Sequence, residues 1–591
     1  MNLYYSKNSL NKKKGDRSDP RVHIAASMII VVAFLIITKL FILMVWQGQF
    51  YKAMAAGSHE VFAQLFPKRG IVFIQDTRTS EKYPLALNRD FFLLFADTRL
   101  IENQDDIENI IEKLSDIFEY EDEKKDEIRL QLSKKDDPYE PIEKKVDEKT
   151  KEIIDALELP GIAFIRSSHR FYPEENLGAH IIGFLGKDSG GNSVGRYGVE
   201  GYWDKELSGS GGFYEGLKSA VGNRIAFGDV KFEPARDGAN ITLTIDRTIQ
   251  FQTCKILQEA MEEYEAQSAT AIVMDPNTGA IRAMCSLPDF NPNNYGSVKS
   301  VSVFNNSAIF TPYEPGSIFK PIVMAAAINE SVLTPQTYFY DTGVKEGVCD
   351  TPIKNAEGRI YEDQNMIGVL ENSINTGMVF VVERLGKENL RTYIENFGFG
   401  AKNGLKLDTE VGGTLESLSR NKSNKVGCYT ATASFGQGIT ATPLQMTSAF
   451  GSLANGGLFL RPYVVEEIDY SNGKIEKTKT KEIRRVISGS SSSLISGMLV
   501  NVVDNGQAGG AKVSGFYVAG KTGTAQISGI GGYTDETNHS FVGYAPIDDP
   551  QFVLFIKFEK PQRSYSSMTA APTFGKIAKF ILEYYGVPPS R

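Results

Sequence analysis

Apolar residues form one uninterrupted run near the N-terminus of the chain. Residues 24–46 contain a single charged residue, Lys39, which lies toward the C-terminal end of the run. A helix of this length measures about 35 Å, enough to cross a hydrocarbon core of about 30 Å. A lysine away from the centre can extend its amine to the interface. The pattern predicts one membrane-spanning helix over residues 24–46.

The segment before this run is basic. Residues 1–23 carry six Lys and Arg residues against two Asp residues, and such residues stay on the cytoplasmic side of a membrane. We therefore expect residues 1–23 to be the cytoplasmic tail of a single-pass cell-membrane protein whose remaining chain is extracytoplasmic. A cleaved signal peptide is the alternative, because residues 53–55 read Ala-Met-Ala. The apolar part of a signal peptide is shorter, about 7–15 residues.

Residues 47–235 mix short strand patterns with one acidic, helical segment. Runs such as 69–74 and 91–95 are rich in apolar β-branched or aromatic residues, as strands are. In residues 102–158, apolar residues recur at helical spacing, and acidic residues outnumber basic ones by 21 to 10. We interpret these charges as the solvated faces of helices, with a cationic binding partner as the alternative.

From residue 240 onward the pattern is that of strands mixed with helices. Residues 249–264 and 575–585 have helical spacing, and a long apolar helix is expected over residues 322–329. The strand-like runs are residues 241–246, 270–274, 280–284, 541–544 and 552–556. The sequence Asp-Pro-Asn-Thr-Gly between the second and third runs indicates a hairpin. Because strands occur at both ends, we predict one sheet built from both ends of this domain and flanked by helices.

The composition excludes only a few classes of protein. The chain has 591 residues, 41% of them apolar, and a net charge of −8. It can therefore form large folded domains, and its acidity argues against a general nucleic-acid binder. The four cysteines are too few and too scattered for a disulfide-stapled scaffold. Neither Cys-x-x-Cys nor His-Glu-x-x-His occurs, so no metal site is predicted.

The first of three informative motifs is Ser317-x-x-Lys320, at the mouth of the apolar helix. Residues three apart share one helix face, so the lysine amine can reach the serine hydroxyl. A serine becomes a nucleophile when a base removes its proton, and a desolvated, neutral lysine can be that base. By itself the pair occurs by chance in many sequences.

The other two motifs follow in the C-terminal half. Ser373-x-Asn375, on a predicted loop, offers a hydroxyl that can relay a proton and an amide that can hold a substrate. Residues 521–524, Lys-Thr-Gly-Thr, stand on a predicted edge strand, along which a substrate backbone can lie. Alone, each motif is more simply a turn or an exposed strand. Together and in this order, the three motifs indicate one acyl-transfer site.

Two well-known patterns lack the context that they require. Residues 515–522 match the phosphate-binding loop Gly-x₄-Gly-Lys-Thr, but they read as a strand and not as the start of a helix. Residues 191–195 match the nucleophile pattern Gly-x-Ser-x-Gly, but they lie in a glycine-rich stretch that we interpret as a flexible linker. His539 is interpreted as a surface or packing residue, outside the mechanism.

The three motifs resemble the S-x-x-K, S-x-N and K-T-G set of penicillin-recognising acyl-serine enzymes. Further family-like stretches are residues 275–281, 286–290, 434–445 and 541–546, and, earlier in the chain, residues 170–173, His180 and residues 198–200. The chain is similar to a class B, high-molecular-weight penicillin-binding protein, a monofunctional peptidoglycan D,D-transpeptidase. Residues 434–445 favour the division- or sporulation-type members. Residues 69–78 lack the second half of the family's RGxIxDRNG-like stretch, which puts an early hairpin there in doubt.

The resemblance implies a mechanism of acyl transfer. Ser317 would attack the penultimate D-Ala carbonyl of a D-Ala-D-Ala stem peptide, with Lys320 as the general base. Ser373 would relay the proton to the leaving D-Ala, and Asn375 would orient the substrate amide. An amine of a neighbouring stem peptide would then take the acyl group and complete the cross-link. β-Lactams would imitate D-Ala-D-Ala and trap Ser317.

The resemblance also implies the binding groups. The terminal carboxylate would be held by Lys521, Thr522, Gly523 and Thr524. The oxyanion would rest on the backbone amides of Ser317 and Thr524, a type of contact worth about 3–4 kcal/mol per donor.

The implied organisation is a β-rich pedestal followed by one α+β transpeptidase domain. The pedestal would span residues 47–235, with the acidic helical insert at 102–158. The transpeptidase domain, with a β-lactamase-like antiparallel sheet flanked by helices, would span residues 236–591. No glycosyltransferase domain fits before it, so we expect as partners a separate membrane glycosyltransferase polymerase and division or elongation proteins. No cofactor is expected.

Two alternatives stay open. The enzyme could pass the acyl group to water, as a D,D-carboxypeptidase or a β-lactam hydrolase does, or the pocket could serve a non-catalytic β-lactam receptor. The pedestal stretches disfavour the first alternative, and the intact motif residues disfavour the second.

Overall fold

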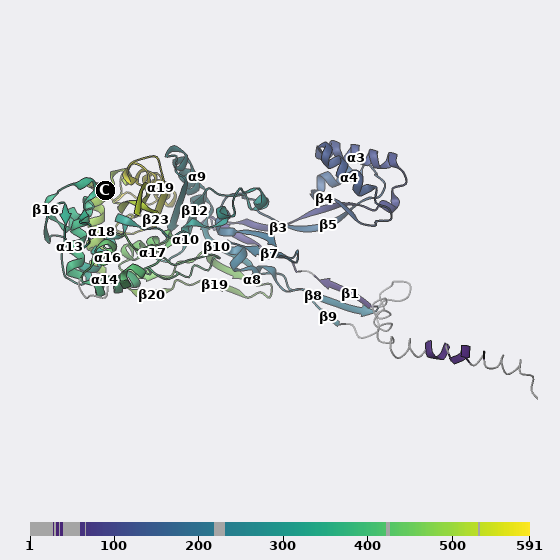
Figure 1. Cartoon of the computed structure of the whole chain (residues 1–591), viewed down its shortest axis with the longest axis horizontal. Coiled ribbons are helices and arrows are strands. Elements are labelled where there is room, and N and C mark those ends of the chain that lie inside the picture. Colours follow the sequence, from purple (N-terminus) through teal and green to yellow (C-terminus); the bar gives the residue numbers. More distant parts are fainter. Residues whose placement is uncertain are drawn as a thin grey trace, which may run out of the picture. The chain divides into compact units, whose positions relative to one another are not determined.

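The structure is a computed structural model (Figure 1) that describes residues 28, 31–34, 36–39, 60–65, 67–217, 231–420, 426–529 and 532–591. The predicted tail, residues 1–23, lies outside the described residues, as does most of the predicted membrane-spanning segment, residues 24–46. Within the described ranges, no helix is both long enough and apolar enough to span a membrane.

The chain forms two compact units. The smaller comprises Met1–Pro67 and Ser210–Arg236, and the larger comprises Lys68–Gly209 and Asp237–Arg591. In the smaller unit, β1 (Glu60–Leu65), β8 (Gly212–Leu217) and β9 (Lys231–Glu233) form an antiparallel sheet in that order. All three sequence motifs lie in the larger unit.

A five-stranded antiparallel sheet forms the centre of the motif-bearing part. Its strands are β11 (Ser268–Met274), β12 (Ile281–Leu287), β21 (Ala519–Gly529), β22 (Gly532–Ala545) and β23 (Phe552–Glu559), in the order β12-β11-β23-β22-β21. The hairpin β11–β12 forms as predicted, and β11 pairs with β23 so that Ile272 lies opposite Phe555. The predicted sheet from both ends of the domain is thus confirmed, and β21 is its edge strand.

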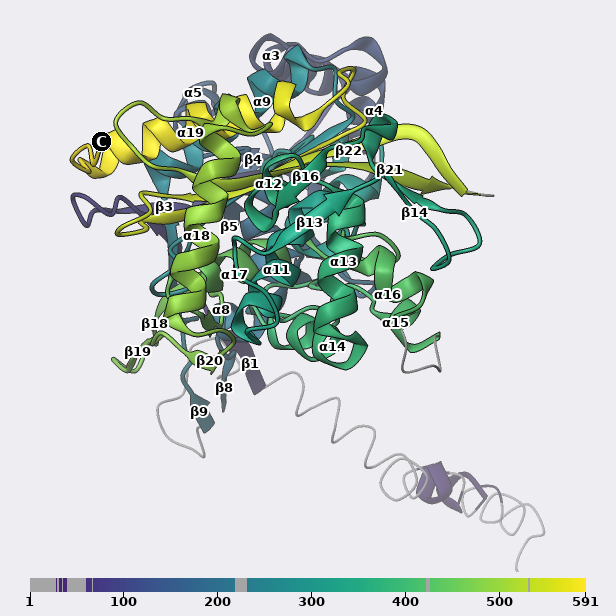
Figure 2. The same cartoon turned by 90° about the vertical axis from the view of Figure 1, so that its left-hand side faces the viewer.

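Helices cover both faces of this sheet (Figure 2). The helices α9 (Arg247–Glu263) and α19 (Ala570–Tyr585) pack on each other and on strands of one face. On the other face lie α17 (Pro443–Ala454) and α18 (Gly489–Asp504), and α11 (Lys320–Asn329) packs against α18. Residues 321–328 of α11 are apolar on all sides, as expected of a buried helix, and α13 (Asn375–Leu385) and α14 (Lys387–Asn396) pack against α11.

A second sheet joins the pedestal to the motif-bearing part. Its strands are β2 (Val72–Gln75), β3 (Lys82–Ala96), β4 (Glu140–Val146), β5 (Ile162–Phe171), β10 (Asn240–Asp246), β18 (Val465–Asp469) and β19 (Ile475–Lys477). The early hairpin that the sequence put in doubt is present, because β2 pairs with β3 and places Ile74 opposite Tyr83. The strand β10, which follows residue 236, pairs parallel with β2, which precedes it. The sheet therefore contains strands from both sides of the predicted domain boundary.

A buried ion cluster fixes the pedestal next to this sheet. Glu200, with no exposed surface, receives hydrogen bonds from Arg170 (2.6 Å) and from Arg69 (2.7 Å). Removing one partner of such a cluster leaves an uncompensated buried charge, which typically costs about 3–5 kcal/mol. Arg170 and Glu200, two of the family-like pedestal residues, therefore have a structural role.

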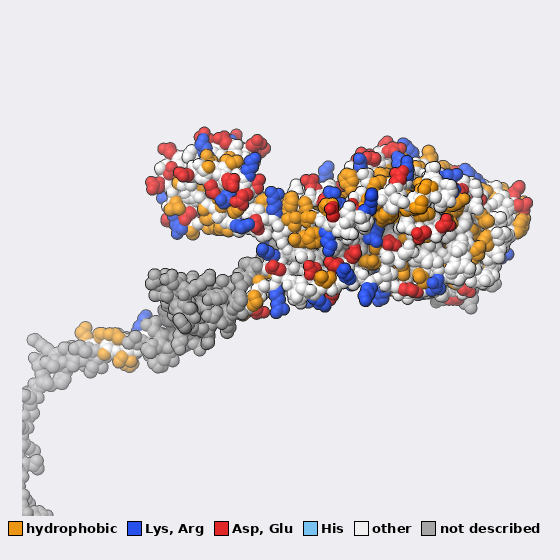
Figure 3. Space-filling model, turned by 180° about the vertical axis from the view of Figure 1, so that it is seen from behind, with side chains coloured by type: hydrophobic (Ala, Val, Ile, Leu, Met, Phe, Trp, Pro, Cys, Tyr) orange, Lys and Arg blue, Asp and Glu red, His pale blue; other side chains and the backbone are white. Residues whose placement is uncertain are grey.

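The acidic segment folds as a small helical insert with its own core. It contains α3 (Gln104–Phe118), α4 (Asp122–Leu132) and α5 (Glu148–Asp155), and Ile107, Ile110 and Leu114 of α3 are buried as their spacing predicts. The strand β4 interrupts the predicted helical pattern. Figure 3 shows acidic side chains spread over the surface of this insert, with apolar ones between them, which agrees with charged, solvated helix faces.

The prediction of a flexible linker at residues 191–195 is wrong. Strands β6 (Phe184–Lys187) and β7 (Ser193–Arg196) form a hairpin, and Gly191, at φ +81°, lies in its turn. A side chain on Gly195 would meet the Glu200 carbonyl oxygen at 1.8 Å. The glycines therefore allow a tight turn and a close approach of two backbone segments.

The remaining elements are short. They are η2 (Thr98–Leu100), α6 (Ala179–Ile182), α7 (Gly198–Tyr202), α8 (Asp204–Ser208), η3 (Pro292–Ser297), η4 (Val301–Phe304), α10 (Ser307–Phe310), η5 (Gly316–Phe319), β13 (Tyr338–Asp341), β14 (Val344–Lys345), β15 (Ile353–Lys354), η6 (Ala356–Gly358), β16 (Glu362–Asn365), α12 (Met366–Glu371), α15 (Glu416–Arg420), α16 (Cys428–Ala433), β17 (Leu458–Leu460), β20 (Glu482–Arg485), η7 (Gly509–Ala511) and η8 (Ser566–Met568).

All four cysteines are paired, which the sequence did not predict. Cys254 on α9 is bonded to Cys285 on β12, and Cys349 is bonded to Cys428 at the start of α16. The first disulfide ties a helix to the sheet that it covers. The second ties the loop between β14 and β15 to α16. Stable disulfides are typical of oxidising, extracytoplasmic surroundings.

Replacing both Cys349 and Cys428 with serine is expected to lower the free energy of unfolding by about 2–4 kcal/mol. The reason is that this disulfide joins residues 79 apart and restricts the unfolded chain. The same double change at Cys254 and Cys285, which are 31 residues apart, should cost roughly 1 kcal/mol less. Denaturant unfolding measures both values, and unchanged midpoints would contradict the expectation.

Candidate active site

The first motif occupies a tight turn at the entrance of a buried helix. Ser317 lies in the 3₁₀ turn η5, and Lys320 is the first residue of α11. Gly316, at φ +58°, donates its N–H to the Gly436 carbonyl (3.0 Å), which anchors the turn. The Ser317 side chain is partly exposed and makes no hydrogen bond within the described part of the chain. Its hydroxyl therefore faces the pocket without a partner.

Lys320 is completely buried, with its amine directed at the second motif. Its Nζ lies within hydrogen-bond distance of the Ser373 carbonyl (2.6 Å), the Ser373 hydroxyl (3.1 Å) and Asn375 Oδ1 (2.8 Å). Burial lowers the pKa of Lys320 well below its usual value, and the positive charge of Lys521 lowers it further. This lowering of the pKa favours the neutral amine, the form that a general base requires.

The second motif joins two helices. Ser373 lies between α12 and α13 at φ +56°, a left-handed conformation that directs its hydroxyl toward both lysines. The Ser373 oxygen is 3.1 Å from Lys320 Nζ and also 3.1 Å from Lys521 Nζ. Asn375 begins α13, and its Nδ2 donates to the Lys354 carbonyl (3.0 Å). A single hydroxyl therefore connects two buried amines.

The third motif lies on the edge strand β21 beside the Ser317 turn. Lys521 is completely buried, and burial lowers its pKa to about 7. Gly523 packs so tightly that a Cβ there would lie 2.7 Å from the Ser540 hydroxyl oxygen and 3.0 Å from Ile318 Cγ2. The close approach of β21 to the Ser317 turn thus depends on glycine.

The Thr524 hydroxyl has a partner that the sequence did not indicate. It donates to the Ser566 hydroxyl (3.2 Å) and accepts from the Ser566 N–H (3.1 Å). Ser566 belongs to η8, which follows the sheet, and its side chain is almost completely buried. This pairing fixes the orientation of the Thr524 hydroxyl.

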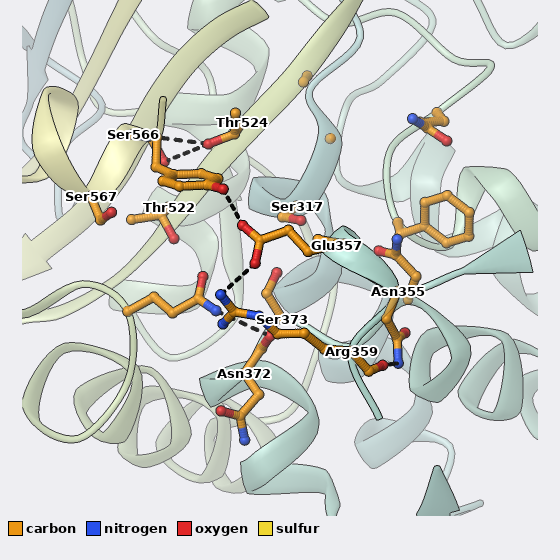
Figure 4. Close-up of a pocket in the computed structure, with 18 of the residues that line it drawn as sticks. Ser317, Asn355, Glu357, Arg359, Asn372, Ser373, Thr522, Thr524, Ser566 and Ser567 are labelled. Carbon is orange, nitrogen blue, oxygen red and sulfur yellow. Dashed lines mark hydrogen bonds and ion pairs between the residues drawn. The ribbon is translucent and has the colours of Figure 1, made fainter. Parts of the chain in front are cut away.

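The motifs meet at one cavity of about 420 Å³ (Figure 4). Five of the predicted residues line it: Ser317, Ser373, Asn375, Thr522 and Thr524. Lys320 and Lys521 lie beneath its surface, and Gly523 packs behind it. All eight residues of the predicted site are therefore brought together.

Other lining residues were missed in the sequence. They include Asn355, Glu357, Arg359, Gln437, Tyr565 and Ser566. Glu357 forms an ion pair with Arg359 and accepts a hydrogen bond from the Tyr565 hydroxyl. Gln437 lies in the family-like stretch 434–445, but the other five stand in no recognisable motif, and the two loops that carry these five are about 200 residues apart in sequence. Only the fold makes them neighbours.

Two patterns set aside in the sequence do not take the roles that such patterns usually have. His539 is buried in β22, where its ring nitrogens contact Thr569 and Thr537, and it does not line the cavity. Residues 515–522 lead into the strand β21 and open no helix, so they do not form a phosphate-binding loop.

Comparisons with known proteins give the family. The family model described as "Penicillin binding protein transpeptidase domain" matches residues 269–579, and the one described as "Penicillin-binding Protein dimerisation domain" matches residues 66–243. The chain is 34% identical over 579 residues to Stage V sporulation protein D of Bacillus subtilis, covering 95% of this chain and 85% of that protein.

A second relative and a solved structure agree with this match. The chain is 30% identical over 469 residues to the peptidoglycan D,D-transpeptidase FtsI homolog of Mesostigma viride, covering 74% of this chain and 76% of that protein. Its fold matches penicillin-binding protein 2X of Streptococcus thermophilus with a TM-score of 0.73 at 22% identity, over 88% of this chain and 80% of the other. The chain therefore belongs to the class B, high-molecular-weight penicillin-binding proteins, the monofunctional peptidoglycan D,D-transpeptidases.

Proposed function

We propose that Ser317 is the nucleophile of this D,D-transpeptidase and that Lys320 is its general base. The fully buried Lys320 amine carries this proposal, because it lies among Ser373 and Asn375 at the start of the helix that follows the Ser317 turn. A neutral amine has two hydrogens and one lone pair. If the hydrogens go to the two nearest acceptors, the Ser373 carbonyl and Asn375 Oδ1, the lone pair is left to accept a proton.

In the proposed acylation, Lys320 takes the Ser317 proton while the Ser317 oxygen attacks the penultimate D-Ala carbonyl of a stem peptide. The tetrahedral intermediate collapses with cleavage of the C–N bond, and the proton passes through the Ser373 hydroxyl to the leaving D-Ala amine. The 3.1 Å contact between Lys320 and that hydroxyl supports this relay. The products are free D-Ala and an ester on Ser317, and Lys320 is neutral again.

The binding groups follow from the same geometry. Lys521, with Thr522, Gly523 and Thr524 of the edge strand, is proposed to bind the terminal carboxylate, while Asn375 orients the substrate amide. The N–H groups of Ser317 and Thr524 are proposed to bind the oxyanion. The tight packing of Gly523 against Ile318 supports this role, since it brings strand and turn together. Removing one such donor typically costs about 10²–10³ in rate.

The two lysines lead to an expected pH dependence. Lys320 acts only when neutral, whereas Lys521 binds a carboxylate best when charged. Because burial lowers the pKa of Lys521 to about 7, its charge is present below that pH and is lost above it. The second-order rate constant of acylation by a carboxylate-bearing β-lactam should therefore fall as the pH rises through about 7.

Lys521→Arg tests the origin of this alkaline limb. Arginine stays charged throughout the range, so the variant should lose the limb even where its changed geometry lowers the overall rate. An unchanged limb in Lys521→Arg would assign the titration to another group.

The experiment that tests the function offers the full chain a D-Ala-D-Ala stem peptide, with and without an amine acceptor. A transpeptidase forms a new amide with the acceptor in proportion to its concentration. A D,D-carboxypeptidase releases only the hydrolysed peptide, and a receptor releases neither. Mass spectrometry of the released peptides separates the three outcomes, and absence of the new amide would refute transfer.

We also propose that residues 24–46 anchor the chain in the cell membrane, with residues 1–23 in the cytoplasm. The apolar run and its basic flank support the anchor, and the two disulfides support an extracytoplasmic catalytic domain. In this organisation residues 47–235 are the pedestal, and residues 236–591 are the transpeptidase domain. A separate membrane glycosyltransferase would supply the glycan strands, and division or elongation proteins would be further partners.

A further inference from the structure

Two side chains of opposite charge face the cavity from one loop. Glu357 lies in η6, and Arg359 is the first residue after η6. The two side chains form an ion pair. Their side chains are 41% and 55% exposed, respectively. Because Lys320 and Lys521 are buried, no other charged side chain lines the cavity among the described residues. Figure 4 shows Glu357 and Arg359 in the same pocket as Ser317 and Ser373.

A buried carboxylate holds this loop in shape. Asp341, with no exposed surface, accepts from the Asn355 amide (2.8 Å) and from the Tyr361 N–H (2.9 Å). The Asn355 amide also donates to the Arg359 carbonyl (3.1 Å). Glu357 itself is held at φ +55°, a left-handed conformation that is unfavourable for this residue type. A strained residue whose surroundings impose its conformation is a common feature of binding sites.

The reaction needs a second substrate that this pair can recognise. After acylation the pocket must admit an amine, and an aliphatic amine enters from neutral water mostly as an ammonium ion. The Tyr565 hydroxyl and Arg359 hold the pKa of Glu357 below its usual value, so Glu357 offers a negative charge at neutral pH. Arg359 offers a guanidinium that can bind a carboxylate through two parallel hydrogen bonds.

We propose that Glu357 and Arg359 form the acceptor subsite, and that this subsite selects an acceptor whose amine and carboxylate share one carbon. This inference rests on the proposed transpeptidase function and specifies its second substrate. The acceptor ammonium binds Glu357, and its carboxylate binds Arg359, so the zwitterion lies antiparallel to the protein's ion pair. An acceptor with an amine alone satisfies Glu357 but brings Arg359 no new partner.

The subsite can exchange partners at low cost. An ion pair between two partly exposed side chains contributes little to stability, so Glu357 and Arg359 can open to admit the zwitterion. The Tyr565 hydroxyl, which donates to Glu357 in the free protein, can keep this contact or release it. The loop itself need not move, because its conformation depends on Asp341 and Asn355.

The transfer step needs only the acceptor, the Ser317 ester and water. The bound ammonium loses one proton to water, and the resulting amine attacks the carbonyl carbon of the Ser317 ester. A C–N bond forms, the C–O bond to Ser317 breaks, and the second amine proton returns to the Ser317 oxygen through Lys320 and Ser373. The product is an amide, and the serine is free again.

Glycine and glycinamide test the subsite, because they differ only in a carboxylate against a carboxamide. The full chain receives a stem-peptide donor with each acceptor, and the transferred and hydrolysed peptides are quantified by mass spectrometry. The preference for glycine over glycinamide is a ratio from which the acylation step cancels. We expect Arg359→Gln to lower this preference about tenfold and Arg359→Lys to retain much of it.

Glu357 should act differently, because both acceptors carry the ammonium. Glu357→Gln is expected to raise the acceptor concentration needed for half-maximal transfer about tenfold for glycine and glycinamide alike. Arg391→Gln is the matched control. It breaks a similarly exposed pair with Glu395 on α14, outside the cavity, and should change neither quantity.

The outcomes separate this inference from the proposed function. An unchanged glycine preference in Arg359→Gln, or an equal loss with both acceptors, would overturn the subsite, as would wild-type behaviour of Glu357→Gln. If the native protein forms a penicillin adduct but transfers to neither acceptor, transpeptidation itself fails. Labelling each variant with a fluorescent penicillin verifies that its pocket is folded.

Discussion

Replacing Lys320 with methionine is expected to slow acylation by a β-lactam about 10²–10⁴-fold, the range in which general bases contribute. Methionine keeps the length and apolar volume of the lysine stem but has no lone pair that can take the Ser317 proton. The Ser373 carbonyl and Asn375 Oδ1 each lose one donor. This loss is offset, because the variant no longer has the free-energy cost of burying an amine, a cost that the lowered pKa of Lys320 reflects.

The free energy of unfolding of Lys320→Met should therefore change little, while its acylation rate falls strongly. The measurement is the time course of covalent labelling by a fluorescent penicillin, together with thermal unfolding of the same samples. Lys557→Met is the matched control, since Lys557 is also buried but contacts Glu559 (3.6 Å) and the Tyr313 ring, outside the cavity. The control should acylate within a few-fold of the native rate. A Lys320→Met protein that acylates at the native rate would exclude Lys320 as the base.

A methyl group added at Gly523 is expected to reduce acylation about 10²-fold, although it removes no functional group. The new Cβ would lie 2.7 Å from the Ser540 oxygen and 3.0 Å from Ile318 Cγ2, so β21 must move away from the Ser317 turn. The proposed oxyanion donors, one on the strand and one on the turn, then no longer fit one oxygen atom.

The control is a glycine-to-alanine substitution at a position where the added methyl group meets no other atom. Gly497 lies exposed in the interior of α18, with no atom within 4 Å of an added Cβ. Gly497→Ala should acylate normally and gain roughly 0.5–1 kcal/mol of stability. Native acylation rates in Gly523→Ala would show that the spacing of strand and turn does not limit the reaction.

Motif chemistry and hydrophobic patterning predicted much of this molecule, for identifiable reasons. The pairs Ser317/Lys320 and Ser373/Asn375 are close in sequence, so helix and turn geometry constrain where their side chains can point. The strands β11 and β23 are apolar because the sheet is covered on both faces, and such runs are legible in a sequence. These apolar runs at both ends of the domain led to the prediction that the two ends form one sheet.

Features that depend on contacts between distant segments were not predictable. The partners of Thr524 and Glu357, which are Ser566 and Tyr565, stand on a loop with no motif. The cysteine pairing depends on which helix and loop the fold places together. The glycines of residues 191–195 look like those of a linker, because a tight hairpin and a flexible segment have the same local composition.

The left-handed Ser373 illustrates the limit most clearly. Its identity is visible in the S-x-N motif, but its φ of +56° and its position between two buried amines arise from the packing of α12 and α13. A sequence shows which groups are available. The shared hydroxyl between Lys320 and Lys521 appears only in the folded chain.

Covalent labelling tests most directly whether Ser317 forms the acyl-enzyme. The full chain and its Ser317→Ala variant are incubated with a fluorescent penicillin, and the adduct is located by peptide mass spectrometry. We expect one adduct per native chain, on the peptide that contains Ser317, and none on the Ser317→Ala variant, whose unfolding transition should be unchanged. Undiminished labelling of Ser317→Ala, or an adduct on another residue of the native protein, would contradict this expectation.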